Sequence, residues 1–144
     1  MLYVYSLSHE HYTSDETADI KQIGYFSSRK ESCQVIEEYK KLDGFREYPN
    51  NFVIKALPIV YGKRVYSNIE YPKVVYVLNH SYEDEEGFDV ISWLGIYASY
   101  DLALRSQQKY MRDKKFNGYP DCFIIDEYEV NKPEWSEGFF TWKS

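Results

Sequence analysis

Residues 20–39 read IKQIGYFSSRKESCQVIEEY, and residues 91–110 read ISWLGIYASYDLALRSQQKY. The two stretches align at an offset of 71 residues (95 minus 24), which pairs Gly24 with Gly95. The same offset holds without a gap over residues 4–125. We therefore predict two tandem copies of a half-size unit. Two fused copies are expected to pack about a pseudo-twofold axis, as the chains of an isologous dimer do.

The first copy predicts the order β-β-α-β. Runs rich in β-branched and aromatic residues at Leu2–Ser8 and Ile20–Phe26 predict two strands. Ser28 with Glu31 three residues later forms a capping box, which predicts a helix start. Phe52–Ile59 follows a Tyr-Pro turn and predicts the third strand. An apolar stripe at helical spacing supports the helix, formed by Ser32, Val35, Ile36, Tyr39 and Leu42.

The second copy predicts the same order. Its expected strands are Val74–Leu78, Ile91–Tyr97 and Phe123–Val130, with Ser99 at the helix start. Ser106 and Gln107 interrupt the apolar stripe of this helix, so we expect looser packing or a wetter inner face. The fold class is α+β, with a mixed or antiparallel sheet and two helices.

The predicted boundaries are 1–59 for the first copy, 60–72 for a linker or short hairpin, and 73–131 for the second copy. Residues 132–144 form an aromatic C-terminal segment. We expect it to fold back on the domain, because exposed aromatic residues would make an unusually apolar tail. The two copies together are expected to form one compact domain.

Composition narrows the function classes. The net charge of −6 and the pI of about 5.1 argue against a nucleic-acid binder, whose surface is basic. Cys33 and Cys122 do not align across the copies, so we expect two free thiols in a reducing compartment. Because no long apolar run is present, we expect a cytoplasmic protein without a membrane span.

No catalytic, cofactor-binding or metal-binding motif is complete. His9-Glu10-His11 offers zinc-ligand types, and a metal-dependent hydrolase using His9 and His11 is one hypothesis. Two His separated by one residue share a face only in a strand, however, and this segment is expected to leave a strand for a loop. Glu83–Asp89 fails as a calcium loop because Tyr82 stands where the first Asp is required. We therefore predict that the protein is not an enzyme and needs no cofactor or metal.

Two acidic loops are the best candidates for a functional surface. The equivalent segments His9–Asp19 and His80–Asp89 contain no Lys or Arg. They are either solvated loop tips or a surface that engages basic residues of a partner protein. The predicted partner-binding residues are Glu10, Tyr12, Asp15, Glu16, Asp19, Tyr82, Glu83, Asp84, Glu85 and Glu86, where the two Tyr would supply apolar contacts.

Four motifs resemble a small, uncharacterised bacterial domain family. They are GYFSSRKE at 24–31, GFREYP at 44–49, YPDCFIIDEYE at 119–129 and WSEGF at 135–139. In that family the unit is usually a single copy of about half this length, which ends in the DEY and WxEGF elements. The first copy departs from the pattern, since Lys55-Ala56-Leu57 replace the DEY element.

The resemblance implies no established activity and no catalytic residues. The small, acidic members of the family look like the immunity proteins that bacteria pair with toxins, including those of contact-dependent growth inhibition. We therefore expect a non-enzymatic protein that neutralises a cognate toxin, such as a nuclease with a basic active site. The alternative is a small-molecule or regulatory ligand-binding module, with the ligand held between the two copies.

Overall fold

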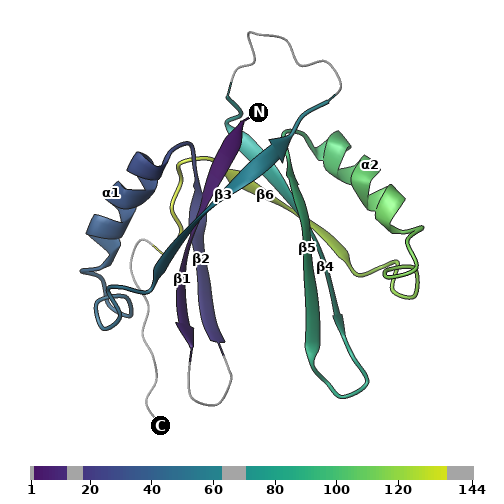
Figure 1. Cartoon of the computed structure of the whole chain (residues 1–144), viewed down its shortest axis with the longest axis horizontal. Helices are drawn as coiled ribbons and strands as arrows, with labels where there is room; N and C mark the ends of the chain where they lie inside the picture. Colours follow the sequence, from purple (N-terminus) through teal and green to yellow (C-terminus); the bar gives the residue numbers. More distant parts are fainter. Residues whose placement is uncertain (1, 13–17, 63–70, 136–144) are drawn as a thin grey trace. The chain divides into compact units, whose positions relative to one another are not determined.

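The computed structural model describes residues 2–12, 18–62 and 71–135 and contains six strands and two helices (Figure 1). In chain order these are β1 (Tyr3–Tyr12), β2 (Ala18–Phe26), α1 (Arg29–Tyr39), β3 (Phe52–Val60), β4 (Val74–Glu83), β5 (Asp89–Tyr97), α2 (Tyr100–Tyr110) and β6 (Phe123–Glu129). The order β-β-α-β thus occurs twice along the chain.

The strands form a mixed sheet in the order β2-β1-β3-β5-β4-β6. β1 pairs with β2, and β4 pairs with both β5 and β6, in antiparallel register. β3 is parallel to β5, where Ile59 pairs with Ile96 and Val60 with Tyr97. This arrangement confirms the α+β fold class with a mixed sheet and two helices.

The sequence offset of 71 residues also relates the elements. The bounds of β1 and β4 differ by 71 at both ends (74 minus 3, 83 minus 12), and so do those of β2 and β5 and of α1 and α2. The repeated glycine has the same packing role in both places. A Cβ at Gly24 would lie 3.1 Å from Cζ of Phe26, and one at Gly95 would lie 2.9 Å from the hydroxyl of Tyr97. Each glycine leaves room for the aromatic ring two positions later.

The first strand of each hairpin is longer than the sequence predicted. β1 continues to Tyr12 rather than ending at Ser8, and β4 continues to Glu83 rather than ending at Leu78. The polar segment after each predicted strand was therefore wrongly assigned to a loop. The physical reason is that His9 and His80 are buried among aromatic rings, so these two histidines belong to the buried face of the sheet.

The chain divides into two compact units. Of the described residues, the α1 unit contains 3–12, 18–57 and 130–135, and the α2 unit contains 2, 58–62 and 71–129. The α2 unit therefore includes the last residues of β3 and those that follow them, and the α1 unit includes the residues that follow β6. In the α2 unit, Ala98 N donates to Val60 O.

In the α1 unit, the residues that follow β6 lie against β2. Asn131 N donates to Tyr25 O and Glu134 N donates to Ile23 O. The Tyr39 hydroxyl also donates to Glu134 O at 2.7 Å. Predictions about 63–70 in the linker and about 136–144 in the aromatic segment fall outside the described residues.

Both helices begin as predicted. Ser28 Oγ accepts a bond from Glu31 N, and Ser99 Oγ accepts one from Leu102 N. α1 packs against β1 and β2, and α2 packs against β4, β5 and β6. The core of the α1 unit consists of Leu7, Ile23, Phe26, Tyr39 and Phe45, and that of the α2 unit is built on Leu78, Tyr97 and Ala103.

Two further observations bear on the sequence predictions. Cys33 and Cys122 are both free thiols, as expected. Within the described ranges, neither helix has the length and apolar character that crossing a bilayer requires.

Candidate functional site: the β4–β5 hairpin

His9 lies in the core of the α1 unit and not in a loop. Its side chain is 2% exposed, and its ring contacts those of Phe45 and Phe52 at centroid distances of 5.1 and 5.0 Å. Its Nε2 lies 3.0 Å from Tyr48 O, so Nε2 carries the proton and donates, because a carbonyl can only accept. Burial lowers the pKa of His9, although the bond to the Tyr48 carbonyl acts in the opposite direction. This histidine is therefore a neutral packing residue.

His80 is the structural equivalent of His9 in the α2 unit. Its Nε2 donates to Tyr119 O at 3.0 Å, and its ring contacts Phe116 and Phe123. Its Nδ1 is buried without a hydrogen-bond partner among the described residues. The two histidines thus join the first strand of each hairpin to the Tyr-Pro turn that precedes the third strand.

Among the described residues, His9 and His11 of β1 do not lie together with further side chains that could bind a metal ion. Both His9 and His11 lie in a strand, and the ring of His11 stacks on Tyr48 at 3.9 Å. Across the described part of the chain, His, Cys, Asp and Glu side chains nowhere form a group of three or more that would hold a metal ion. The His9-Glu10-His11 hypothesis therefore gains no support from the geometry.

The first acidic segment is largely engaged within its own hairpin. Tyr12, which is exposed, donates to Glu10 Oε1 at 2.6 Å, and this bond lowers the pKa of Glu10. Asp19 lies in β2 and forms an ion pair with Lys21 at 2.6 Å. Asp15 and Glu16, which we also predicted to bind a partner, fall outside the described residues.

The second acidic segment forms the tight tip of the β4–β5 hairpin. Gly87, with φ of 85°, adopts the left-handed conformation that this turn needs. Asp84 holds the turn, because its Oδ1 accepts bonds from the backbone N–H groups of Glu86 and Phe88. Of the predicted partner-binding residues, Asp84 therefore has a structural role as well as a charge.

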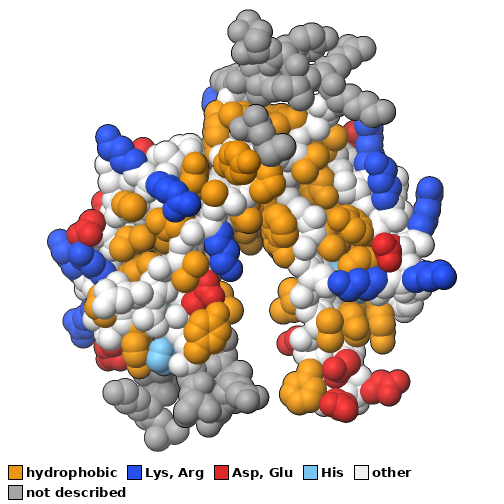
Figure 2. Space-filling view, viewed as in Figure 1, with side chains coloured by type: hydrophobic (Ala, Val, Ile, Leu, Met, Phe, Trp, Pro, Cys, Tyr) orange, Lys and Arg blue, Asp and Glu red, His pale blue; other side chains and the backbone are white. Residues whose placement is uncertain are grey.

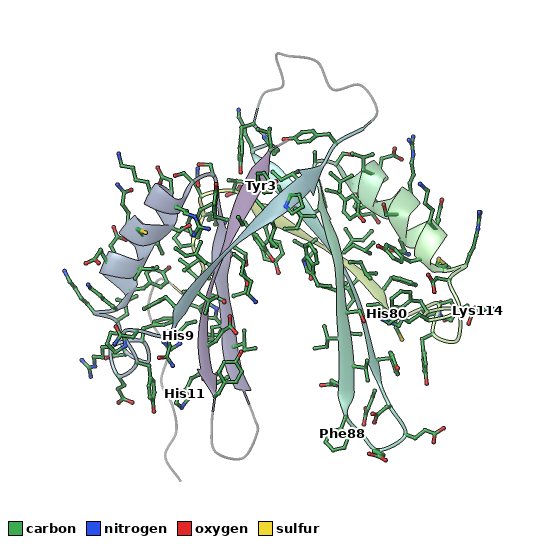
Figure 3. The ribbon with its side chains drawn as sticks, viewed as in Figure 1. Tyr3, His9, His11, His80, Phe88 and Lys114 are labelled. Atoms are coloured by element: carbon green, nitrogen blue, oxygen red, sulfur yellow. The ribbon has the colours of Figure 1, made fainter. Side chains whose placement is uncertain are left out.

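The remaining carboxylates of this tip face solvent. Glu83, Glu85 and Glu86 are exposed, and none of them forms an ion pair with a residue that the structure describes. Figure 2 shows acidic side chains in red beside hydrophobic surface at this hairpin tip, and Figure 3 labels Phe88 there. Phe88 is 65% exposed.

Tyr82, a predicted apolar contact of this tip, packs within its own unit. It lies in β4, where its ring stacks on that of Tyr119 at 4.0 Å, and it is half-buried. Phe88 is the more exposed aromatic residue of the tip. The signal that sequence reasoning missed is a large aromatic residue directly beside a glycine turn in an acidic run.

The helix-free face of the α2 unit carries further exposed apolar residues. Ile91 and Trp93 in β5 are 67% and 45% exposed, and Ile124 in β6 is 47% exposed. Trp93 and Ile124 both pair with Asn79 of β4, so they lie in one row across three strands. Sequence reasoning missed this face, since it requires knowing which side of the sheet α2 covers.

Charge is distributed unevenly over the α2 unit. β4, β5 and β6 contain no Lys or Arg, whereas their charged residues are Glu83, Asp89, Asp126, Glu127 and Glu129. Among the described residues of this unit, the basic side chains lie directly before β4, in α2 and in the turn after α2, namely Lys73, Arg105, Lys109, Arg112, Lys114 and Lys115, of which Lys114 is labelled in Figure 3. The hairpin and sheet of this unit are therefore acidic and apolar.

A pocket of about 270 Å³ lies beside α2. It is lined by Tyr97, Ser106, Lys109, Tyr110 and Asp113. Tyr97 is buried at its base, where burial raises the pKa of its hydroxyl and Ser106 hydrogen-bonds it. The pocket agrees with the wetter inner face that Ser106 predicted for this helix.

Comparisons with known proteins find a similarity for the second half of the chain. No curated protein and no solved structure matches the sequence. Residues 73–139 match the model of a family described as a domain of unknown function (DUF7336). This match covers β4, β5, α2, β6 and the residues that follow them, so the segment with the acidic hairpin carries the similarity to an uncharacterised domain family.

Proposed function

We propose that this chain is a non-enzymatic binding protein that neutralises a basic protein partner, most simply an immunity protein acting on a cognate toxin. The observation that carries the proposal is the tip of the β4–β5 hairpin, where Glu83, Glu85 and Glu86 are exposed without ion-pair partners among the described residues. Exposed Phe88 lies within the same tip.

This combination suits a protein interface. Unpaired carboxylates attract a basic surface over a long range, which speeds association and favours the correct partner. An exposed aromatic residue next to them supplies apolar area that charged residues lack. A toxin that acts on nucleic acid has a basic substrate surface, and covering that surface would block its activity.

The first hairpin is expected to contribute less. Lys21 neutralises Asp19, and Glu10 accepts bonds from Ser8 and Tyr12. We therefore assign the main interface to the second hairpin, and the predicted roles of Asp15 and Glu16 stay predictions.

The test is a pull-down of partners from the native cell at low and high salt, with matched charge reversals. Glu85→Lys/Glu86→Lys removes the charge of the tip, and Glu37→Lys/Glu38→Lys reverses two adjacent exposed glutamates on α1 as the control. We expect a basic partner in stoichiometric amount, retained at low salt and lost from the tip variant but not from the control. Equal retention of the partner by both variants would show that the tip of the β4–β5 hairpin does not bind it.

A second candidate function is a small-molecule binding module. The pocket beside α2 favours it, because Lys109 and Asp113 place opposite charges at its wall and two Tyr supply apolar surface. This chemistry suits a small zwitterionic ligand. The pocket lies inside the α2 unit, whereas a site between the two copies stays a prediction.

Thermal unfolding with a panel of zwitterionic metabolites tests this second candidate. A ligand that binds only the folded state raises the melting temperature. The control is Ser106→Val/Asp113→Leu, which carries the residues found at the equivalent positions of the first copy, Val35 and Leu42. A shift seen in both proteins would place the ligand elsewhere.

A further inference from the structure

β5 has an open edge over most of its length. Its inner edge pairs with β4 from Asp89 to Tyr97, but its outer edge pairs with β3 only at Ile96 and Tyr97. For residues 89–94, the part of the chain that the structure describes supplies no strand on that side. Such an edge presents unpaired backbone N–H and C=O groups, which can accept another strand.

The hairpin register shows which peptide groups face outward. Asp84 N donates to Phe88 O, and antiparallel pairs alternate between hydrogen-bonded and non-hydrogen-bonded types. Val90 and Ser92, paired with Tyr82 and His80, therefore direct their peptide groups toward β4. The peptide groups of Ile91 and Trp93 consequently face the open edge. On the other side of β4 the pattern agrees, since Ser81 N donates to Cys122 O of the segment before β6.

Over residues 89–93 this edge lacks several of the devices that usually protect edge strands. Proteins discourage unwanted pairing with Lys, Pro, a β-bulge or a covering segment. The register shift of this hairpin lies at the end of that stretch, between the pair of Asn79 with Trp93 and the pair of Leu78 with Gly95. β2, the equivalent strand of the α1 unit, contains Lys21, and Glu134 N covers its edge at Ile23 O. Over residues 89–94 the only charged side chain of β5 is Asp89. Of the two equivalent strands β2 and β5, β5 is therefore the one whose edge has no covering segment among the described residues.

The side chains beside the edge define what it would accept. Ile91 and Trp93 are exposed on the helix-free face, and Phe88 is exposed at the tip. Glu83, Glu85, Glu86 and Asp89 lie at the same end of the strand. We propose that β5 binds an extended segment of a partner protein as an added antiparallel or parallel strand, and that this segment alternates basic and apolar residues.

Each feature of the proposed segment is complementary to a feature of β5. Backbone hydrogen bonds to Ile91 and Trp93 would supply affinity, and side chains on alternate positions would supply specificity. Apolar residues would cover Ile91 and Trp93, while Arg or Lys would meet the carboxylates at the tip. The inference rests on the proposed function for the basic charge of the partner, but the strand pairing is independent of it.

A defined probe tests the strand pairing. The probe is a short peptide of alternating arginine and valine, blocked at both ends, and its control is the same peptide with alternate backbone nitrogens methylated. Methylation keeps the charges and side chains but removes the backbone donors on one edge. We expect methylation to weaken binding to the full chain by about tenfold or more, since several hydrogen bonds are lost together.

Amide hydrogen exchange of the full chain locates the bound peptide. The proposal predicts slower exchange at Ile91 and Trp93 on binding, with little change at Val90 and Ser92, which already face β4. The fold-preserving variant Ile91→Lys places a gatekeeper charge on the open edge and should weaken binding. Ile20→Lys, at the equivalent exposed position of β2, is the matched control.

The outcomes separate this inference from the proposed function. If both peptides bind equally and Glu85→Lys/Glu86→Lys weakens both, docking is by charge alone, and the strand pairing is wrong while the proposed function stands. If methylation weakens binding but charge reversal has no effect, the open edge is confirmed and the basic partner is contradicted. If neither peptide binds, the strand-addition proposal is overturned, and the pull-down alone judges the proposed function.

Discussion

The β1–β2 and β4–β5 hairpins have the same length, the same register shift and a buried histidine at the same place, yet their surfaces differ. Lys21 and Gln22 of β2 correspond to Ser92 and Trp93 of β5. In the first hairpin, Lys21 pairs with the carboxylate of Asp19 and Tyr12 donates to that of Glu10. The residues after β6 cover part of the edge of β2. The second leaves its carboxylates and one edge open. The comparison teaches that one scaffold can carry one closed and one open hairpin.

The two helices show the same contrast between a closed and an open arrangement. Under α1, the apolar residues Phe26, Val35 and Leu42 belong to the core or pack against it. The equivalent residues of the α2 unit are Tyr97, Ser106 and Asp113, which line the pocket beside α2. Three polar replacements thus accompany the pocket beside α2, at positions where the α1 unit has apolar side chains in or against its core.

The largest expected effects test whether the two cores are equivalent. Phe45 contacts His9, Tyr39 and Phe52, and Phe116 makes the matching contacts in the α2 unit. Phe45→Ala and Phe116→Ala should each lower the free energy of unfolding of their unit by about 3–5 kcal/mol. Urea denaturation checks both. A cost below about 1 kcal/mol at either position would contradict the equivalence.

A smaller effect tests the closure of the α1 unit by the residues after β6. Tyr39→Phe removes the buried hydroxyl that donates to Glu134 O and leaves that carbonyl without this donor. We expect a loss of about 1–2 kcal/mol in unfolding free energy and faster amide exchange at Glu134. Tyr110→Phe is the matched control in the α2 unit and should cost less. Equal costs would show that the hydroxyl bond is not what distinguishes the units.

The pocket beside α2 can be closed by transplanting residues from the first copy. Tyr97→Phe/Ser106→Val reproduces Phe26 and Val35, and removing both hydroxyls together leaves neither unpaired. Added apolar contact should raise the unfolding free energy by about 1 kcal/mol. The reverse exchange, Phe26→Tyr/Val35→Ser, should lower it. Stabilisation by both exchanges, measured by denaturation, would contradict the packing comparison.

The smallest expected effect is a pH dependence set by His9. Burial lowers its pKa in the folded state below the unfolded value of 6.5, so the unfolded chain binds more protons in this range. His9 therefore lowers stability as the pH falls from 6.5 toward its folded pKa, by about 1.4 kcal/mol for each pKa unit of separation. Urea midpoints between pH 8 and 5 measure this loss. In His9→Gln, the part of the pH dependence of stability that is due to this residue should disappear. An unchanged pH dependence would show that other groups cause it.

Local sequence signals predicted the elements and their order. Ser28 and Ser99 were found as helix caps because their side chains act on backbone groups three residues away. Looser packing or a wetter face of α2 was expected because Ser106 breaks a helical apolar stripe, and a pocket lined by Ser106 lies there. These features depend on near neighbours in the chain, which the sequence displays directly.

Features that depend on distant segments were missed. β1 and β4 were ended too early because a buried histidine reads as polar unless its aromatic neighbours are known. Asn131 was assigned to the second copy, and the segment from residue 132 was expected to fold back on the domain without a stated place, although Asn131 and Glu134 both bind β2. The open edge and helix-free face of β5 were missed because they follow from the strand order and from the side that α2 covers.

The central claim is that the open hairpin meets a basic partner, and the ionic-strength dependence of the association rate tests it most directly. The measurement compares the wild-type chain with the tip variant Glu85→Lys/Glu86→Lys, which leaves the turn-forming Asp84 in place, and with the α1 control Glu37→Lys/Glu38→Lys, each against the captured partner. We predict that the tip variant associates more slowly and with a flatter dependence on salt, while the control keeps the steep dependence of the wild type. Association rates that are unchanged in the tip variant, or slowed equally in both variants, would contradict the claim.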